Sequence, residues 1–308
     1  MLDQFFHLLL QLSFQKVNMP DWQSPPSRVL ATVDWLSGAT APRKARIDGV
    51  ESVGVRLQAK RALAIDLNSG AILYEKLSHE PQPIASITKL MTAMVVLDLG
   101  LDAEKIVQML PSDERVGAFT NVYRYENILT KDLLAASLIP SDNNATVALA
   151  RSTGLSDAEF AAAMNQKAKD LGMADSTFVE PTGLDEGNQA SAYDVAKLVY
   201  SALQYPQIAA LTTQDKYSFT VQGSGRAVNL SSTDYLLSNQ LFTNGEYKIL
   251  GGKTGFIDEA GYCFAVAMEN QAGQKVLGVI LGSQSIDSRF QDMKALWHWV
   301  LNNYNWQN

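Results

Sequence analysis

The segment that decides the fold runs from Ile84 to Ala93 and reads IASITKLMTA. From Ser86 to Leu99 the residues are apolar almost all round, which predicts a helix that is buried on every side. Ser86 begins this helix and Lys89 follows one turn later, so both side chains face the same way. Burial disfavours a charged lysine, and a neutral amine can take the proton of a neighbouring hydroxyl. Taken alone, S-x-x-K is also explained by a helix cap beside a solvent-reaching lysine.

The segments around this helix predict the rest of the architecture. Two apolar runs, at 62–67 and 71–75, are separated by Asn68-Ser69-Gly70 and predict a β-hairpin. Helical periodicity dominates between 102 and 210, and three strands are expected at 247–256, 262–269 and 275–281. A final amphipathic helix follows, with an apolar face made of Phe290, Met293, Leu296, Trp297, Val300, Leu301 and Tyr304.

This order of elements predicts an α/β (α+β) fold, with an antiparallel sheet flanked by helices and an inserted all-helical lobe. Residues 1–60 are expected to be leader and linker, and 61–308 to form one domain. Its sheet lobe would come from 61–85 and 245–308, and its helical lobe from about 86–244. A cleft between two such lobes is a natural place for a ligand.

Composition excludes several classes of function. The 308 residues carry a formal net charge of −7, which disfavours a nucleic-acid partner. Cys263 is the only cysteine, and the three histidines form no H-E-x-x-H pair, so we expect no metal and no cofactor. If a serine is the nucleophile, its base need not be histidine. Cys263 could itself be a nucleophile, but a lone cysteine in a strand is more often a small buried apolar residue.

Two further motifs follow Ser86 in the chain. Ser141-Asp142-Asn143 precedes a predicted helix, where it is either an N-cap or a source of one hydroxyl and one amide for a substrate. Three glycines fall within Gly251-Gly252-Lys253-Thr254-Gly255, inside a predicted strand, which suggests close approach of another backbone, such as an added peptide strand. A phosphate-binding loop is excluded, because Tyr247 stands where that pattern needs glycine.

Together, S-x-x-K, S-D-N and K-T-G form the signature of class A β-lactamases and penicillin-binding proteins. The sequence resembles the low-molecular-mass penicillin-binding proteins, the D-alanyl-D-alanine carboxypeptidases and endopeptidases, from about Arg61 to Trp299. The resemblance also covers the stretches LNSGAILY at 67–74, FVEPTGL at 178–184 and AGY at 260–262. It implies the β-lactamase/DD-peptidase-like fold.

The resemblance also implies a chemistry for each motif. Ser86 would attack a D-Ala–D-X peptide bond of a peptidoglycan stem peptide and form an acyl-enzyme, with β-lactam antibiotics as covalent inhibitors. The catalytic residues would be Ser86, Lys89 and Ser141. The oxyanion hole would be formed by the backbone N–H groups of Ser86 and Phe256. The substrate-binding residues would be Asn143, Lys253, Thr254, Gly255, Phe256 and Arg289, with Thr254 and Arg289 on the terminal carboxylate.

Members of this family work outside the cytoplasm, in the periplasm or cell envelope. The apolar run at 5–14 is too short to span a bilayer, and with Asp3 before it and no preceding lysine or arginine it is an atypical export signal. No integral membrane anchor is evident. The sequence stops at Asn308, right after the last predicted helix, so we expect a short form closer to the endopeptidase-type relatives. The motifs do not decide between a terminal D-Ala bond and a crosslink.

Two rival functions remain open. A class A-like serine β-lactamase would need a carboxylate for deacylation, and Glu180 lies in about the right region. Thr182-Gly183-Leu184 follows it, however, which departs from the E-x-x-L-N pattern of those enzymes, so we expect slow release of a penicilloyl group from Ser86. A non-catalytic penicillin-binding scaffold would be expected to have lost Ser86 or Lys89, and both are present.

Overall fold

The computed structural model describes residues 43–44, 54–117, 120–239 and 244–306. The expected leader and most of the expected linker lie outside these ranges. None of the helices within them combines the length and the apolar character that crossing a bilayer requires. A short pair of strands, β1 (Arg43–Lys44) and β13 (Tyr304–Asn305), joins the two ends of the described chain.

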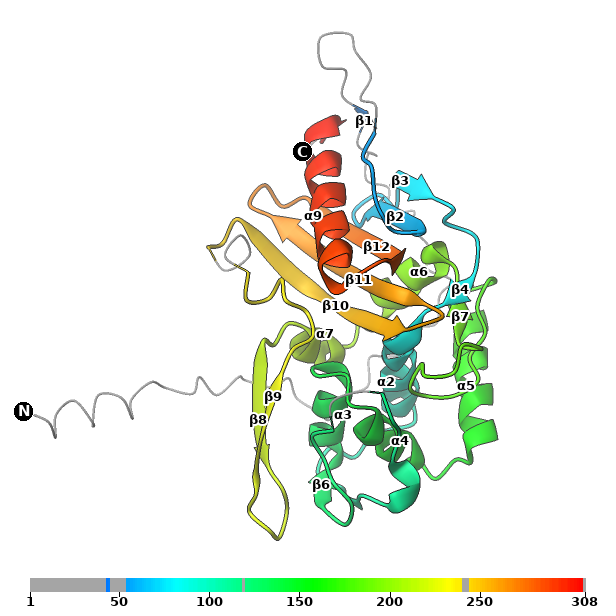
Figure 1. Cartoon of the computed structure of the whole chain (residues 1–308), viewed down its shortest axis with the longest axis vertical. Coiled ribbons are helices and arrows are strands. Elements are labelled where there is room, and N and C mark those ends of the chain that lie inside the picture. The colour runs from blue at the N-terminus through cyan, green and yellow to red at the C-terminus, as the bar shows by residue number, and fades with distance from the viewer. Residues whose placement is uncertain (1–42, 45–53, 118–119, 240–243, 307–308) are drawn as a thin grey trace, which may run out of the picture.

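The central sheet has five strands in the order β10–β11–β12–β2–β3, and every neighbouring pair is antiparallel (Figure 1). The hairpin predicted near the N-terminus is confirmed, with Gly70 in the left-handed region at φ 73°. The late strands and this hairpin form one sheet although residues 77–246 lie between them in the chain, because β2 pairs with β12. The strands are β2 (Arg61–Asp66), β3 (Ile72–Lys76), β10 (Tyr247–Ile257), β11 (Gly261–Asn270) and β12 (Lys275–Ser283).

Both faces of the sheet are buried, and strand alternation divides the side chains between two cores. On β11, Phe264, Val266 and Met268 pack with the apolar face of α9 (Ile286–Asn303). The alternate residues Cys263, Ala265 and Ala267 belong to the larger core on the opposite face, together with the helices. Figure 1 shows α9 lying across one face of the sheet and α6 (Ala192–Ala202) behind it. The final amphipathic helix predicted from the sequence is therefore confirmed, and its apolar face packs against the sheet.

Helix α2 lies at the centre of the larger core, and all its residues from Thr88 to Leu97 are buried. The turn before it, η1, is a short 3₁₀ segment that contains Ser86, so the serine stands just ahead of the α-helix rather than in its first turn. The helices are η1 (Ala85–Ile87), α2 (Thr88–Asp98), α3 (Thr130–Leu138), α4 (Asn143–Arg151), α5 (Asp157–Asp170), α6 (Ala192–Ala202) and α7 (Pro206–Thr212), with η2 (Pro111–Asp113) a further 3₁₀ turn.

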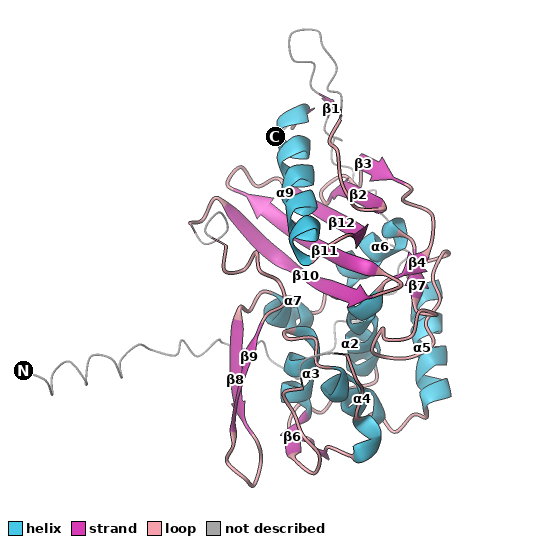
Figure 2. Ribbon diagram, viewed as in Figure 1, coloured by secondary structure: helices cyan, strands magenta, loops and turns pink. Residues whose placement is uncertain are grey.

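The insertion between β3 and β10 is not all-helical, which corrects one detail of the expected fold (Figure 2). It contains the pairs β4–β7, β5–β6 and β8–β9. The β8–β9 hairpin forms because Tyr217 and Phe219 alternate with polar residues, as do Val228 and Leu230 on the partner strand. The strands are β4 (Gln82–Pro83), β5 (Ile106–Gln108), β6 (Asn127–Leu129), β7 (Gln189–Ala190), β8 (Lys216–Thr220) and β9 (Ala227–Ser231). The lobe boundaries at 85/86 and 244/245 stay a prediction.

Candidate active site

Ser86 stands on a turn that is clamped between two other segments of backbone. Ala85, the residue before it, has a left-handed φ of 48°, which is uncommon for a residue with a side chain. A β carbon added to Gly183 would lie 2.0 Å from the Ala85 carbonyl oxygen, and one added to Gly255 would lie 2.7 Å from that of Ile84. Only glycine fits at either position, so these two contacts fix the place of the serine.

Lys89 is fully buried beneath this turn and points at Ser86. Its Nζ lies 2.8 Å from Ser86 Oγ, 2.7 Å from Asn143 Oδ1 and 2.8 Å from the Thr182 carbonyl oxygen. Burial lowers the pKa of Lys89 to about 7, although the nearby carboxylates of Glu180 and Asp142 act in the opposite direction. Near neutral pH the amine is thus partly uncharged. Its two remaining hydrogens then meet Asn143 and Thr182, which turns the lone pair toward the serine hydroxyl.

The S-D-N loop supplies its three residues to three different tasks. Asp142 is the N-cap of α4, and its Oδ1 accepts a hydrogen bond of 3.0 Å from the Ala145 N–H. Asn143 begins the helix and reaches Lys89. Ser141 has a left-handed φ of 68°, and its buried Oγ has no hydrogen-bond partner among the described residues. The capping role that the sequence allowed for this motif falls to Asp142, which leaves the Ser141 hydroxyl facing the site.

The glycine-rich strand brings a second buried lysine. Lys253 is 2% exposed, and its Nζ donates to the Thr254 carbonyl oxygen at 3.0 Å. Burial, followed by the cations of Lys89 and Arg289, holds the pKa of Lys253 well below its usual value. Thr254 Oγ1 lies 2.6 Å from the hydroxyl of Thr233. The predicted K-T-G strand therefore faces the S-x-x-K turn.

Arg289 lies in the first turn of α9 and is 6% exposed. Its Nη1 donates to the Gly255 carbonyl oxygen at 3.3 Å, while its Nε has no partner among the described residues. Its guanidinium carbon lies 5.7 Å from the centre of the Tyr262 ring. The carboxyl group of Asp234 is also buried here, and burial raises its pKa to about 6 against the opposing effect of Arg289 and Lys253. The Arg289 guanidinium is thus held in place by Gly255, while its Nε has no hydrogen-bond partner in the part of the chain that the structure describes.

A groove of about 550 Å³ connects these elements. Six predicted site residues line it, namely Ser86, Ser141, Thr254, Gly255, Phe256 and Arg289. The other three, Lys89, Asn143 and Lys253, are buried and are not among the residues that line it. Sequence reasoning missed Thr233, Tyr235 and Tyr262, which also line the groove. The resemblance already quoted Tyr262 without giving it a role, whereas Thr233 and Tyr235 carry no motif that would have identified them.

Two other candidates from the sequence have different surroundings. Cys263 is fully buried, and burial raises the pKa of its thiol to about 11, so it behaves as the apolar core residue that we expected. Glu180 accepts hydrogen bonds from its own loop and is absent from the lining of the groove. Within the described ranges, no cluster of three or more histidine, cysteine or acidic side chains is arranged to hold a metal ion.

An antiparallel sheet beside a helical insertion, with a serine and a buried lysine between them, defines a serine peptidase of the β-lactamase-like class. The chain belongs to the D-alanyl-D-alanine carboxypeptidase family, whose sequence model matches residues 48–285. The D-alanyl-D-alanine endopeptidase of Pseudomonas aeruginosa is 33% identical over 246 residues, which cover 79% of this chain and 77% of that protein. The D-alanyl-D-alanine endopeptidase of Escherichia coli is 34% identical over 242 residues, covering 78% and 76%.

A solved structure shares the fold and a similar level of identity. Penicillin-Binding Protein D2 from Listeria monocytogenes, in its cefotaxime-bound form, is 30% identical with a TM-score of 0.69. The match covers 81% of this chain and 100% of that chain. The predicted family, the β-lactamase-like fold and the enzyme class are confirmed: the protein is a serine-type D-Ala-D-Ala carboxypeptidase or endopeptidase.

Proposed function

We propose that this enzyme hydrolyses D-Ala–D-X bonds of peptidoglycan stem peptides through an acyl-enzyme on Ser86, with Lys89 as the general base. The observation that carries the proposal is the environment of Lys89. Its Nζ lies 2.8 Å from the serine hydroxyl, its pKa is lowered to about 7, and two other acceptors direct its lone pair to that hydroxyl. General bases work best when their pKa lies near the operating pH.

The reaction proceeds in two halves. Lys89 takes the Ser86 proton while Oγ attacks the carbonyl carbon of D-Ala, and the backbone N–H groups of Ser86 and Phe256 receive the developing oxyanion. Ser141 and Lys253 pass the proton to the leaving amine as the C–N bond breaks. Water then attacks the ester, and its oxygen stays with the released carboxylate while Ser86 recovers its proton.

Substrate binding is assigned to the outer strand and its neighbours. The stem peptide lies along β10, the edge strand of the sheet, and pairs with it as an added strand. Asn143 uses its Oδ1 for Lys89, so its amide nitrogen is the group offered to a substrate carbonyl. Thr254 and Arg289, which both line the groove, bind the terminal carboxylate, because a guanidinium group forms charge-assisted hydrogen bonds to carboxylates.

The crosslink is the preferred bond in this proposal, so that the leaving amine is the side-chain amine of a second stem peptide. The endopeptidases of Pseudomonas aeruginosa and Escherichia coli support this choice by their similarity over most of both chains. The enzyme would act outside the cytoplasm, where that substrate is found. It would also be acylated by β-lactams, as the cefotaxime-bound relative suggests.

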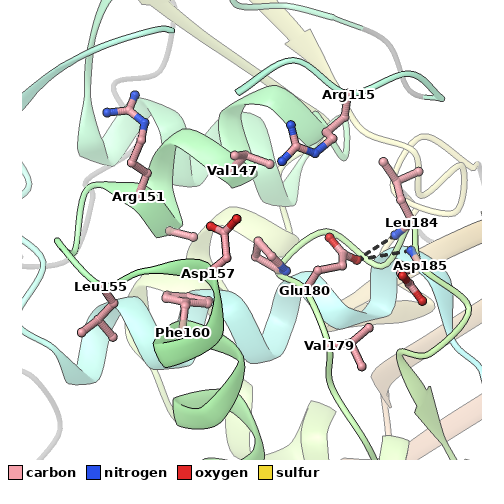
Figure 3. Close-up of a pocket in the computed structure, with 12 residues that line it drawn as sticks. Arg115, Val147, Arg151, Leu155, Asp157, Phe160, Val179, Glu180, Leu184 and Asp185 are labelled. Atoms are coloured by element: carbon pink, nitrogen blue, oxygen red, sulfur yellow. Dashed lines mark hydrogen bonds between the residues drawn. The ribbon is translucent and has the colours of Figure 1, made fainter. Parts of the chain in front are cut away.

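The β-lactamase alternative requires a carboxylate that activates water beside the ester. Glu180 is the candidate from the sequence, but Thr182 N–H and Leu184 N–H occupy its two oxygens at 2.7 and 2.9 Å. It also lines a different cavity from the groove of Ser86 (Figure 3). We therefore expect slow release of the penicilloyl group. Rapid turnover of benzylpenicillin by the wild type would favour the β-lactamase.

Two measurements test the proposal. Fluorescent penicillin should label the wild type covalently at Ser86, with a peptide mass that locates the adduct, and the Ser86→Ala variant should stay unlabelled. Purified crosslinked muropeptide dimers should be converted to monomers, read by mass. Loss of a single D-Ala instead would make the enzyme a carboxypeptidase, and no label on the wild type would favour a non-catalytic scaffold.

A further inference from the structure

Glu180 organises the loop that passes behind the nucleophile, here called the 180–188 loop. Its Oε2 accepts from the Thr182 N–H at 2.7 Å and from the Thr182 hydroxyl at 2.6 Å. Its Oε1 accepts from the N–H groups of Gly183 and Leu184 and from Asn188 Nδ2. Figure 3 shows the carboxylate turned into its own loop toward Leu184 and Asp185. One side chain thus gathers most of the donors of the loop.

The same loop forms hydrogen bonds to residues on both sides of η1, the turn that carries Ser86. The Thr182 carbonyl oxygen accepts from Lys89 Nζ at 2.8 Å. The neighbouring Pro181 carbonyl oxygen accepts from the Thr92 hydroxyl of α2 at 2.6 Å. At its far end, the Asn188 carbonyl oxygen accepts from the Ile84 N–H at 3.1 Å. The loop therefore connects Ile84, the residue before η1, with α2, the helix that follows η1.

The contact with Lys89 is the one that bears on chemistry. A neutral lysine amine has two hydrogens and one lone pair. If Asn143 and Thr182 each accept one hydrogen, the lone pair has only the Ser86 hydroxyl left to face. If the Thr182 carbonyl group were displaced, the Lys89 amine could rotate, and its lone pair would no longer point at the Ser86 hydroxyl.

We propose that Glu180 is a positioning residue for the Ser86–Lys89 pair, acting through the Thr182 carbonyl that its carboxylate holds in place. The inference rests on the proposed function, since it assigns Lys89 the role of base. It gives Glu180 a task in acylation and none in the release of the acyl group. This role differs from that of a deacylating carboxylate, which must reach the ester.

The negative charge of Glu180 should also affect the pKa of Lys89, which gives a second way to test this role. Three ionisable groups face Lys89: Glu180 from the 180–188 loop, Asp142 from the N-cap of α4, and Lys253 from β10. The two carboxylates raise the pKa of Lys89 against the larger effect of burial. Removing the charge of Glu180 should therefore lower that pKa, and the pH midpoint of acylation should move down.

The experiment measures the second-order acylation constant with benzylpenicillin from about pH 5.5 to 9, together with the rate of penicilloyl release. In Glu180→Gln we expect the acylation constant at its high-pH plateau to fall about 100-fold, because the base is misplaced. The midpoint of the pH profile should move to lower pH. In Glu180→Asp, which keeps the charge but has a shorter reach, the plateau should fall with little change in midpoint. Penicilloyl release should match the wild type in both.

The matched control is Glu186→Gln, which removes an exposed charge from the same loop. It should leave plateau and midpoint unchanged. The inference is overturned if Glu180→Gln acylates as the wild type does, or if it acylates normally and only releases the penicilloyl group more slowly. A wild type that is not acylated at Ser86 would instead defeat the proposed function. Should Glu180→Gln fail to fold, the plateau of Glu180→Asp carries the same test.

Discussion

The backbone of Gly255 lies so close to that of Ser86 that a β carbon added to the glycine would be 3.1 Å from the serine nitrogen. The same carbon would lie 2.7 Å from the Ile84 carbonyl oxygen, closer than any relaxed contact allows. The nucleophile's turn and the glycine-rich strand are therefore aligned by direct contact between main chains.

Replacing Gly255 by alanine should separate these two elements. Backbone atoms cannot move aside as a flexible side chain can, so we expect Gly255→Ala to lower the acylation constant for penicillin about 100-fold. Gly273→Ala, in the turn between β11 and β12, is the control, because its added carbon meets nothing within 4 Å. That variant should lose some stability from its left-handed backbone and keep its acylation rate. Equal rates in the two variants would contradict the prediction.

Acylation of the wild type should rise with pH through a midpoint near 7. The base is the uncharged form of Lys89, and burial lowers the pKa of this amine to about 7, so the active form accumulates above that pH. The measurement is the benzylpenicillin acylation constant across that range, at constant ionic strength. A rate that stays flat through neutrality, or that falls as the pH rises, would mean that another group accepts the serine proton.

Arg289→Gln should weaken substrates that carry a free terminal carboxylate. A charge-assisted hydrogen bond contributes about 1.5–3 kcal/mol, so kcat/KM for such a peptide should fall about 10- to 100-fold. The same peptide with an amidated terminus should be hydrolysed equally by both enzymes. Arg226→Gln serves as control, because this arginine is paired with Glu126 and is absent from the lining of the groove. An equal loss on both peptides would assign Arg289 a structural role.

Asp292 on α9 should be important for stability rather than for chemistry. Its buried carboxylate accepts from the N–H groups of Gln58 and Ala59 at 3.0 and 2.8 Å, and from the Ser283 hydroxyl at 3.0 Å. Asp292→Ala leaves these donors without their acceptor, so the free energy of unfolding should fall by about 3 kcal/mol. Denaturant unfolding measures this, with the exposed Glu259→Ala as a control that changes little.

Most of the site could be predicted from the sequence because its reactive groups are side chains that belong to short sequence motifs. The spacing of Ser86 and Lys89, the S-D-N loop and the K-T-G strand are local patterns, and each lies where expected around one groove. The final helix could be predicted equally well, because its apolar residues repeat at helical spacing. The catalytic roles assigned to these residues remain proposals.

The features that sequence reasoning missed depend on backbone and on distance. The Thr182 carbonyl, which holds Lys89, could belong to any residue type, so no pattern marks it. The left-handed φ of Ala85 is imposed by its neighbours rather than by its own preference. Only folding brings Asp234 near enough to Arg289 and Lys253 for their charges to lower its pKa. The β8–β9 hairpin is different, because its alternating apolar residues and the glycines between its strands are visible in the sequence, next to stronger helical patterns.

The position of β10 at the border of the sheet has a further consequence. An edge strand with unpaired main-chain groups can pair with a strand of another molecule, which leads to aggregation, and many proteins cover or interrupt their edge strands for that reason. If the stem peptide pairs with β10 as we propose, this enzyme cannot adopt that protection without excluding its own substrate. A bound ligand would then also cover the edge of β10. We expect enzyme saturated with a β-lactam to stay monodisperse at concentrations at which the free enzyme aggregates.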